Sequence, residues 1–333
     1  MMPCMTIWIK RLILLTLLAT LLGAGGLAWY ATQPLQIAPL PQTLNVTPGT
    51  NLRSLSTMLK REGVIGNAPV FWLLGRVTGK AGTLKLGVYT LDKPLTPLAL
   101  YEKFERGEVS QAVIQFIEGK NWREVRASLA AQPLLKNDSA DLTDAELMRA
   151  IGAEESHPEG LMFPDTYFYT PHTSDLDVLR RAYRLQRDKL EAAWAERAPD
   201  LPYRTPYEAL IMASIVEKET GAAFERPEIA GVFINRLRLG MRLQTDPTVI
   251  YGLGERFDGN LRRTDLERDT PYNTYTRAGL PPTPIAMPSE AAIRAALNPA
   301  KTKALYFVAR GNGTHVFSST LDAHNRAVNR YQR

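Results

Sequence analysis

The sequence has few of the residues and motifs that most catalytic chemistries require. Its 333 residues include one cysteine, Cys4, so an intramolecular disulfide framework is excluded. Cys4 also precedes a long hydrophobic segment and would lie on the reducing side of a membrane. A cysteine nucleophile in the chain that follows is therefore excluded as well.

Motifs for metal, serine and nucleotide chemistry are also missing. The histidines show no metal-ligand spacing such as HExxH, and we expect each to be structural or exposed. There are four of them: His157, His172, His315 and His324. No GxSxG elbow, SxxK pair, Walker loop or GxGxxG loop occurs. With these chemistries excluded, carboxylate catalysis is the one we expect if the chain is an enzyme that lies outside the cytoplasm, beyond the hydrophobic segment. Glycoside cleavage is the commonest reaction of that kind. Neither a metal nor an organic cofactor is expected.

Charge does not point to a nucleic-acid partner. The 40 Lys and Arg residues exceed the 34 Asp and Glu residues only modestly, and the basic residues form no long run. No zinc-finger spacing or RNP-like aromatic motif is present either. A mixed, solvated surface explains the excess, and mild attraction to anionic membrane or cell-wall polymer is compatible with it. The length suits two globular domains.

Residues 12–30 form a run of about 19 residues without charge, close to the ~20 that span a bilayer as a helix. Lys10 and Arg11 precede the run, and Trp29 and Tyr30 suit the far interface. We predict a signal anchor with a cytoplasmic tail over residues 1–11; a cleaved signal peptide is the alternative. Residues 31–43, rich in proline and polar residues, are expected to be an extended linker.

The middle of the chain divides into two regions. Residues 44–118 predict a small α+β module with helices over 52–62, 68–78 and 95–106 and strands over 84–91 and 110–117. Residues 119–204 are mostly helical, interrupted by the aromatic, proline-containing stretch EGLMFPDTYFYT (159–170). Its Glu159 and Asp165 are expected to be caps or turn formers, or else to line a groove whose aromatics stack on sugars.

One helix, over residues 209–221, sets an acid into apolar surroundings. Leu210, Ala213, Ser214 and Glu217 share a face at helical spacing, so Glu217 emerges beside small residues. Poor hydration there favours the protonated carboxyl that a general acid needs. The alternative is a solvated, amphipathic helix end. Glu219 points elsewhere; it is expected either to support the site from behind its contact residues or to be solvated, and we favour the solvated alternative.

Residues 205–333 carry two stretches, 241–254 and 269–289, that we expect to be long irregular loops. Both are dense in side chains that hydrogen-bond sugars, and we select Gln244, Asn273 and Tyr275 as candidate substrate-binding residues. Asp246, before a proline, is expected to be a turn residue. Arg310-Gly311-Asn312-Gly313 predicts a hairpin between strands over 304–309 and 314–318, followed by a final helix.

Several blocks of this last third closely resemble the endolytic murein transglycosylases of the MltG/YceG-like family. The blocks are ASIVEKETG (213–221), VFINRL (232–237), GMRLQTDPTVIYGLG (240–254), YNTYTRAGLPPTPIAMPS (272–289) and LYFVARGNGTHVFSSTLDAHN (305–325). EGLMFPDTYFYT (159–170) resembles another block of the family. The resemblance is weak before residue 110.

The resemblance implies an α+β protein: a transmembrane anchor, a LysM-like module over 44–118, a helical connecting region over 119–204 and a catalytic domain over 205–333. It implies single-pass insertion in the bacterial inner membrane, with the catalytic domain in the periplasm. Members cut nascent peptidoglycan strands and leave 1,6-anhydroMurNAc ends, which would terminate strand growth. The family's catalytic glutamate corresponds to Glu217, and no cofactor is implied.

The expected partners are glycan strands and the membrane, with peptidoglycan synthases or divisome and elongasome proteins as further candidates. Two alternatives stay open: a non-catalytic glycan-binding scaffold of the wall-synthesis machinery, and a muramidase-type hydrolase.

Overall fold

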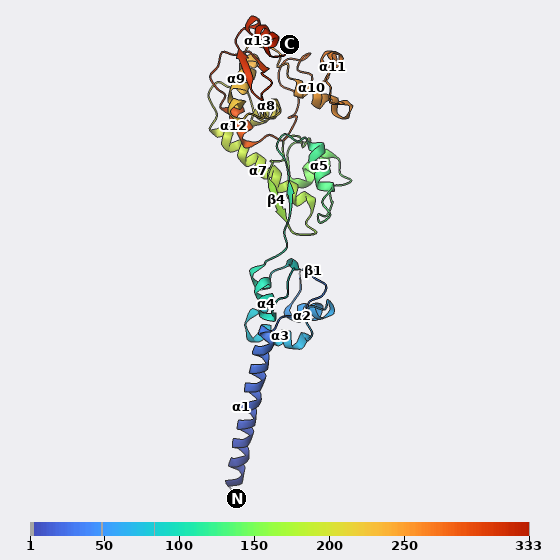
Figure 1. The fold of residues 1–333 in the computed structure, drawn as a ribbon, viewed down its shortest axis with the longest axis vertical. Coiled ribbons are helices and arrows are strands. Elements are labelled where there is room, and N and C mark those ends of the chain that lie inside the picture. The colour runs from blue at the N-terminus through green and yellow to red at the C-terminus, as the bar shows by residue number, and fades with distance from the viewer. Residues whose placement is uncertain (1–2, 48, 83, 333) are drawn as a thin grey trace. The chain divides into compact units, whose positions relative to one another are not determined.

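The computed structural model describes residues 3–47, 49–82 and 84–332, and the chain divides into two compact units, residues 1–112 and 113–333 (Figure 1). Residues 1–2 and 333, at the ends of the predicted tail and catalytic domain, lie outside the described part, as does the side chain of Cys4. Helices and small two-stranded sheets make up both units, which confirms the predicted α+β class.

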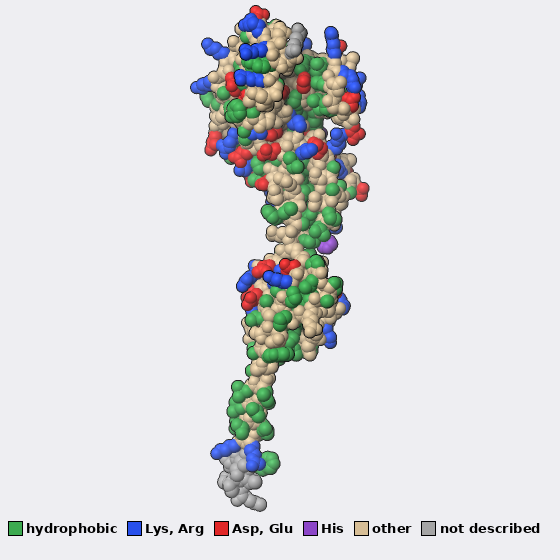
Figure 2. Space-filling model, in the orientation of Figure 1, with side chains coloured by type: hydrophobic (Ala, Val, Ile, Leu, Met, Phe, Trp, Pro, Cys, Tyr) green, Lys and Arg blue, Asp and Glu red, His purple; other side chains and the backbone are tan. Residues whose placement is uncertain are grey.

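The first unit begins with α1 (Pro3–Thr32), an unbroken helix. Its stretch Trp8–Thr32 is long and apolar enough to cross a membrane, alone among the described helices. Large side chains project outward along it, as Figure 2 shows, and Leu14 and Leu21 are 67% and 69% exposed. This confirms the predicted N-terminal apolar helix, and the span is a candidate for a single membrane crossing.

The rest of the first unit packs three helices and an antiparallel strand pair around one core. The elements are β1 (Gln42–Val46), α2 (Leu52–Arg61), α3 (Ala68–Val77), the short 3₁₀ turn η1 (Lys80–Gly82), β2 (Gly87–Leu91) and α4 (Pro97–Arg106). β1 pairs antiparallel with β2, with Leu44 opposite Tyr89. Phe71 of α3 stacks on Tyr101 of α4 with ring centroids 4.2 Å apart.

The core of this unit extends into the segment predicted to be a linker. Leu35 and Ile37 are buried in it, together with Ala31 at the end of α1. The backbone N–H of Leu35 donates to the carbonyl of Leu95 at 2.8 Å. Apolar side chains at these positions dock the segment onto the module, which a solvated tether would not do.

The second unit contains the remaining elements. They are β3 (Ala112–Gln115), α5 (Trp122–Ala130), α6 (Asp144–Ile151), β4 (Thr166–Tyr169), α7 (Asp175–Ala195), α8 (Pro206–Glu219), η2 (Ala223–Glu225), α9 (Arg226–Arg238), α10 (Asp246–Leu253), η3 (Gly254–Arg256), α11 (Arg263–Glu267), α12 (Glu290–Leu297), β5 (Tyr306–Ala309), β6 (His315–Ser318) and α13 (Leu321–Tyr331). β3 pairs with β4, and β5 pairs antiparallel with β6. α8 packs against α7, α9, α10 and α12 and forms the centre of this unit (Figure 1).

The expectation of an irregular loop over residues 241–254 is wrong after its first five residues. Residues Asp246–Leu253 form α10, with Pro247 in its first turn. A proline there has the helical φ already and lacks only an N–H that the first turn leaves unpaired. The Asp246-Pro247 pair therefore starts a helix, where a turn was expected.

Candidate active site

The C-terminal end of α8 carries the two glutamates that the sequence singles out. Thr205 caps the helix by accepting the N–H of Glu208 at 3.3 Å, and Pro206 occupies the first turn. Every side chain from Ala209 to Val216 is buried, so α8 is a core helix with packing partners all around. Such a helix places its last turn rigidly.

A proline-rich segment is fixed alongside this last turn. Buried Ser214 accepts the backbone N–H of Ile285 at 3.0 Å and donates to the carbonyl of Ile211. Met287 exchanges backbone hydrogen bonds with Gly119 and Lys120, each 2.8 Å long. The segment therefore joins α8 to the loop that precedes α5.

Glu217 is held by converging donors, and its side chain is 6% exposed. Oε2 accepts the backbone N–H of Ser289 at 2.9 Å and the Ser289 hydroxyl at 2.5 Å. Oε1 lies 3.3 Å from Nη2 of Arg226, whose side chain is 12% exposed. Ser289 is the N-cap of α12, so the carboxylate also lies at a helix N-terminus, where partial positive charge stabilises an anion.

Glu219 is not solvated, contrary to expectation. It is half-buried, and its carboxyl accepts a hydrogen bond from the Thr245 hydroxyl. Burial raises the pKa of Glu219 to about 7, and the nearby Asp246 adds to this, while the hydrogen bond from Thr245 opposes it. This carboxyl can hold or release a proton near neutral pH.

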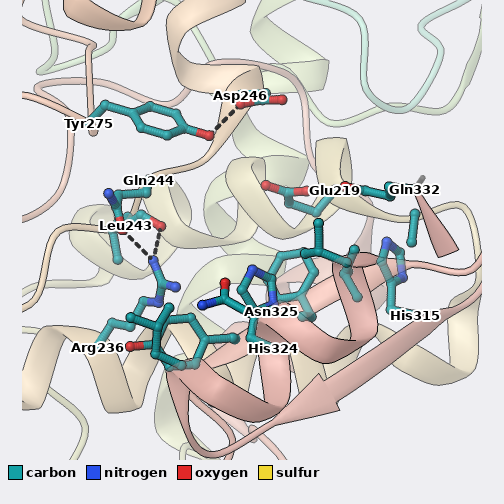
Figure 3. Close-up of a pocket in the computed structure, with 16 residues that line it drawn as sticks. Glu219, Arg236, Leu243, Gln244, Asp246, Tyr275, His315, His324, Asn325 and Gln332 are labelled. Carbon is teal, nitrogen blue, oxygen red and sulfur yellow. Dashed lines mark hydrogen bonds between the residues drawn. The ribbon is translucent and has the colours of Figure 1, made fainter. Parts of the chain in front are cut away.

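Glu219 lines a cavity of about 520 Å³ together with Gln244 and Tyr275 (Figure 3). The Tyr275 hydroxyl donates to Oδ1 of Asp246 at 2.5 Å, and Gln244 Oε1 lies 3.4 Å from Nη1 of Arg236. Glu217 does not line this cavity. Two of the predicted substrate-binding residues, Gln244 and Tyr275, thus lie in one cavity with Glu219. Glu217 lies outside that cavity.

Asn273, the third predicted substrate-binding residue, is fully buried. Its Nδ2 donates to the carbonyls of Asp265, Leu266 and Arg268, and its Oδ1 accepts the N–H of Tyr275 at 2.8 Å. Its amide nitrogen and its amide oxygen both bond to the backbone. These contacts favour a role in organising the loop that presents Tyr275 over a contact with a sugar.

A second cavity, of about 810 Å³, lies beside the loop over residues 159–170. Lys218, between the two glutamates, lines it, as do four aromatic side chains: Trp122, Tyr251, Phe257 and Tyr272. Glu159 lines it too and is 2% exposed, accepting the Trp122 N–H and the Tyr251 hydroxyl at 3.0 Å each. Burial raises the pKa of Glu159 to about 7.

Glu159 and Asp165 were each expected either to form a cap or turn or to line a groove. Glu159 lines a cavity, as the second interpretation predicts. Asp165 instead accepts the N–H of its neighbour Thr166 at 2.7 Å and does not line the cavity, as expected of a turn former.

Glycine is required next to Glu159. Gly160 has φ of +76°, and a Cβ built there would lie 2.4 Å from Cβ of Pro284. Only glycine permits this backbone to approach the proline-rich segment so closely.

Sequence reasoning missed several residues of the site. His315, expected to be structural or exposed, is half-buried and lines the cavity of Glu219. Its Nδ1 lies 2.7 Å from Oε2 of buried Glu225, whose Oε1 accepts the His315 N–H at 3.0 Å. No spacing in the sequence links positions 225 and 315. Ser289 was detectable only as the residue that begins a helix. Within the described residues, no group of three or more His, Cys, Asp or Glu side chains could hold a metal ion.

Comparison with known proteins shows the family to which the chain belongs. The model of the YceG-like family matches residues 44–330. The chain belongs to the YceG-like family. A protein of Bacillus subtilis named endolytic murein transglycosylase is 34% identical over 306 residues, which cover 86% of this chain and 84% of that protein. A protein of Streptococcus pneumoniae with the same name is 26% identical and is covered over 62% of its length.

A solved structure agrees with this membership. The crystal structure of a YceG-like protein from Listeria monocytogenes superimposes with a TM-score of 0.54 at 31% identity, covering 86% of this chain and 98% of that one. The YceG-like match ends within α13 and contains the end of α8 and every residue that lines the two cavities except Gln332. Glu217, Glu219 and the residues that contact their carboxyl groups therefore lie within the family region.

Proposed function

We propose that this YceG-like protein is a membrane-anchored lytic transglycosylase that cleaves the MurNAc–GlcNAc bond within nascent peptidoglycan strands and leaves 1,6-anhydroMurNAc ends. The observation that carries the proposal is Glu217 at the end of α8, held by Ser289 and Arg226 within a block that resembles the family's catalytic block. The relatives named endolytic murein transglycosylase support the reaction class.

In this proposal Glu217 serves first as acid and then as base. It donates a proton to the glycosidic oxygen as the bond from C1 of MurNAc to that oxygen breaks. It then accepts the proton of the MurNAc C6 hydroxyl as that oxygen bonds to C1. No water is consumed, and the proton lost is regained, so one carboxyl suffices. Ser289 and Arg226 hold the carboxylate in place while it is ionised.

The two cavities offer subsites on either side of the last turn of α8. Lys218 lines the aromatic-lined cavity and Glu219 lines the cavity with Gln244 and Tyr275, so the last turn of α8 contributes to both, while Glu217 lines neither. Flat apolar rings suit the faces of sugars, while amide and hydroxyl groups suit their N-acetyl and hydroxyl groups. We place glycan units in both cavities, with Gln244 and Tyr275 as the substrate contacts.

The anchor and the first unit complete the proposal. We infer that α1 spans the inner membrane with Lys10 and Arg11 on the cytoplasmic side, which puts the second unit in the periplasm. The first unit would act as a LysM-like glycan-binding module. Strand termination would then occur where strands are made, next to synthases and divisome or elongasome proteins.

A specific observation favours a second candidate, a muramidase-type hydrolase. Glu219 and Asp246 line one cavity, and two carboxyls are what a glycosidase that activates water requires. Burial raises the pKa of Glu219 to about 7, which suits an acid. In this candidate Glu219 replaces Glu217 as the catalytic acid.

One experiment separates these possibilities. The purified full chain is incubated with peptidoglycan sacculi, and the products are identified by mass spectrometry, alongside Glu217→Gln and Glu219→Gln. We expect anhydro ends and a loss of at least about 100-fold in rate for Glu217→Gln, with folding retained. Ends heavier by one water, abolished by Glu219→Gln alone, would establish the hydrolase. Wild-type products at the wild-type rate from Glu217→Gln would refute its assignment, and no products from the unaltered chain would favour a scaffold.

A further inference from the structure

The exposed face of α3 is apolar, although the helix is not in the predicted membrane anchor. Phe71 and Leu74 face the core, while Trp72, Leu73 and Val77 are 36%, 45% and 67% exposed. The segment Ala68–Val77 contains no acidic residue, and Arg76 is its only charged residue. A water-facing helix surface normally carries its polar residues on this side. This face is built for a less polar environment than water.

α3 lies beside the last turns of α1 (Figure 1). Leu27 and Tyr30 of α1 pack against the same core cluster that contains Phe71 and Leu74, and Ala31 belongs to that cluster. With Lys10 and Arg11 on the cytoplasmic side, the crossing begins at Leu12, and about 20 residues are needed to cross the hydrocarbon layer. The crossing thus ends near Ala31, which already belongs to the core of the first unit. No free linker separates the membrane from this unit.

The residues on this face are those that prefer the boundary between lipid and water. Trp29 of α1 is 67% exposed, and Trp72 of α3 lies under the Arg76 guanidinium, 5.8 Å from its ring centroid. Tryptophan concentrates at membrane interfaces, and arginine extends its charge to the headgroups while its stem stays in apolar surroundings. Figure 2 shows hydrophobic side chains both around α1 and on the first unit next to it.

We propose that α3 is a second membrane contact, lying in the headgroup region of the bilayer with Trp72, Leu73 and Val77 toward the acyl chains. The inference rests on the proposed membrane crossing of α1. Lipid is favoured as the occupant because the face is continuous with the apolar surface of α1 and adjoins the end of its crossing. The contact would hold the first unit on the membrane surface and restrict its tilt and rotation about α1.

Depth measurements on the full chain test this proposal. The native cysteine is replaced (Cys4→Ser), and single cysteines are introduced at Leu73, at exposed Leu18 of α1 and at Asn45 on the polar exposed side of β1. Each is labelled with an environment-sensitive fluorophore in vesicles of phosphatidylethanolamine and phosphatidylglycerol, with quenchers attached at shallow or deep positions of the lipid. All three positions are exposed, and circular dichroism checks that each variant folds.

We expect the shallow quencher to quench the label at position 73 at least threefold more than the label at position 45. The deep quencher should quench the label at position 18. Adding Val77→Lys should reduce the quenching at position 73. If the label at position 18 is quenched while those at 73 and 45 behave alike, α1 anchors the protein and the α3 contact is refuted. The α3 contact with lipid is also refuted if the label at position 73 enters an apolar environment only when a second protein is added. If position 18 is not quenched, the membrane crossing itself fails.

Discussion

Ser289 donates both its backbone N–H and its hydroxyl to Oε2 of Glu217, at 2.9 and 2.5 Å. The two residues are 72 positions apart, and Ser289 also begins α12, accepting the N–H of Ala292 at 3.2 Å. The start of one helix therefore positions the carboxylate at the end of another. Ser289 is a positioning residue for the proposed acid/base, and its loss should affect both catalysis and helix capping.

Replacing Ser289 by alanine should lower the rate of anhydro-end formation about tenfold, because one of the two donors to Oε2 of Glu217 disappears. It should also lower the free energy of unfolding by about 1 kcal/mol through loss of the N-cap. Thr143→Ala is the matched control, since Thr143 caps α6 in the same way and does not line either cavity. It should lose similar stability and keep full activity. Equal activity of the two variants would show that the Ser289 hydroxyl does not act on Glu217.

Stability should fall as pH rises from about 4.5 to about 7, because the pKa values of Glu159 and Glu219 are both raised from 4.5 to about 7 by burial. Each carboxyl binds its proton more tightly in the folded state, so its contribution is complete below its unfolded pKa of about 4.5 and is lost through about pH 7. At about 1.4 kcal/mol per pKa unit, each group contributes at most about 3 kcal/mol.

Chemical denaturation at several pH values measures this slope, and Glu219→Gln should make it shallower. Glu191→Gln, at an exposed position of α7, should leave it unchanged. A slope that is identical in Glu219→Gln and the unaltered chain would contradict the protonation of Glu219.

Asn273→Ala should destabilise the protein rather than weaken substrate binding selectively. Three backbone carbonyls and the N–H of Tyr275 lose a buried partner, at a cost of at least about 2 kcal/mol. Gln244→Ala, at an exposed cavity position, should change stability by less than about 0.5 kcal/mol and raise KM for glycan. Thermal unfolding together with KM distinguishes the two, and a normal Tm with a raised KM for Asn273→Ala would return Asn273 to the substrate contacts.

Gly160→Ala should destabilise the second unit by at least about 2 kcal/mol, because it combines an unfavourable positive φ with a contact to Pro284. Gly279→Ala is the control: φ there is +86°, and no atom lies within 4 Å of the added Cβ. It should lose only about 1 kcal/mol. If the two variants have the same Tm, the proline-rich segment yields to the methyl group and the close approach is not essential.

Much of the local structure could be predicted from the sequence. Periodicity and capping residues located α2, α3 and α4 to within a few residues of their observed ends, and the Gly-Asn-Gly turn predicted the pairing of β5 with β6 and the helix that follows it. Hydropathy alone identified the apolar span in α1. α10 was missed because a polar, proline-containing stretch does not show helical periodicity, although Pro247 at its start is compatible with a helix.

The sequence by itself determined the N-terminal apolar helix, several of the other helices and the apolar helix that ends in Glu217 and Glu219, because these follow from interactions between near neighbours in the chain. The tertiary structure alone decided which partners meet each carboxyl. Ser289 and Arg226 meet Glu217, while Thr245 and the cavity with Tyr275 meet Glu219. It also decided that Asn273 faces backbone and that Glu225 pairs with His315 across 90 residues. Hydration and charge at a side chain depend on segments distant in sequence, and only packing brings those together.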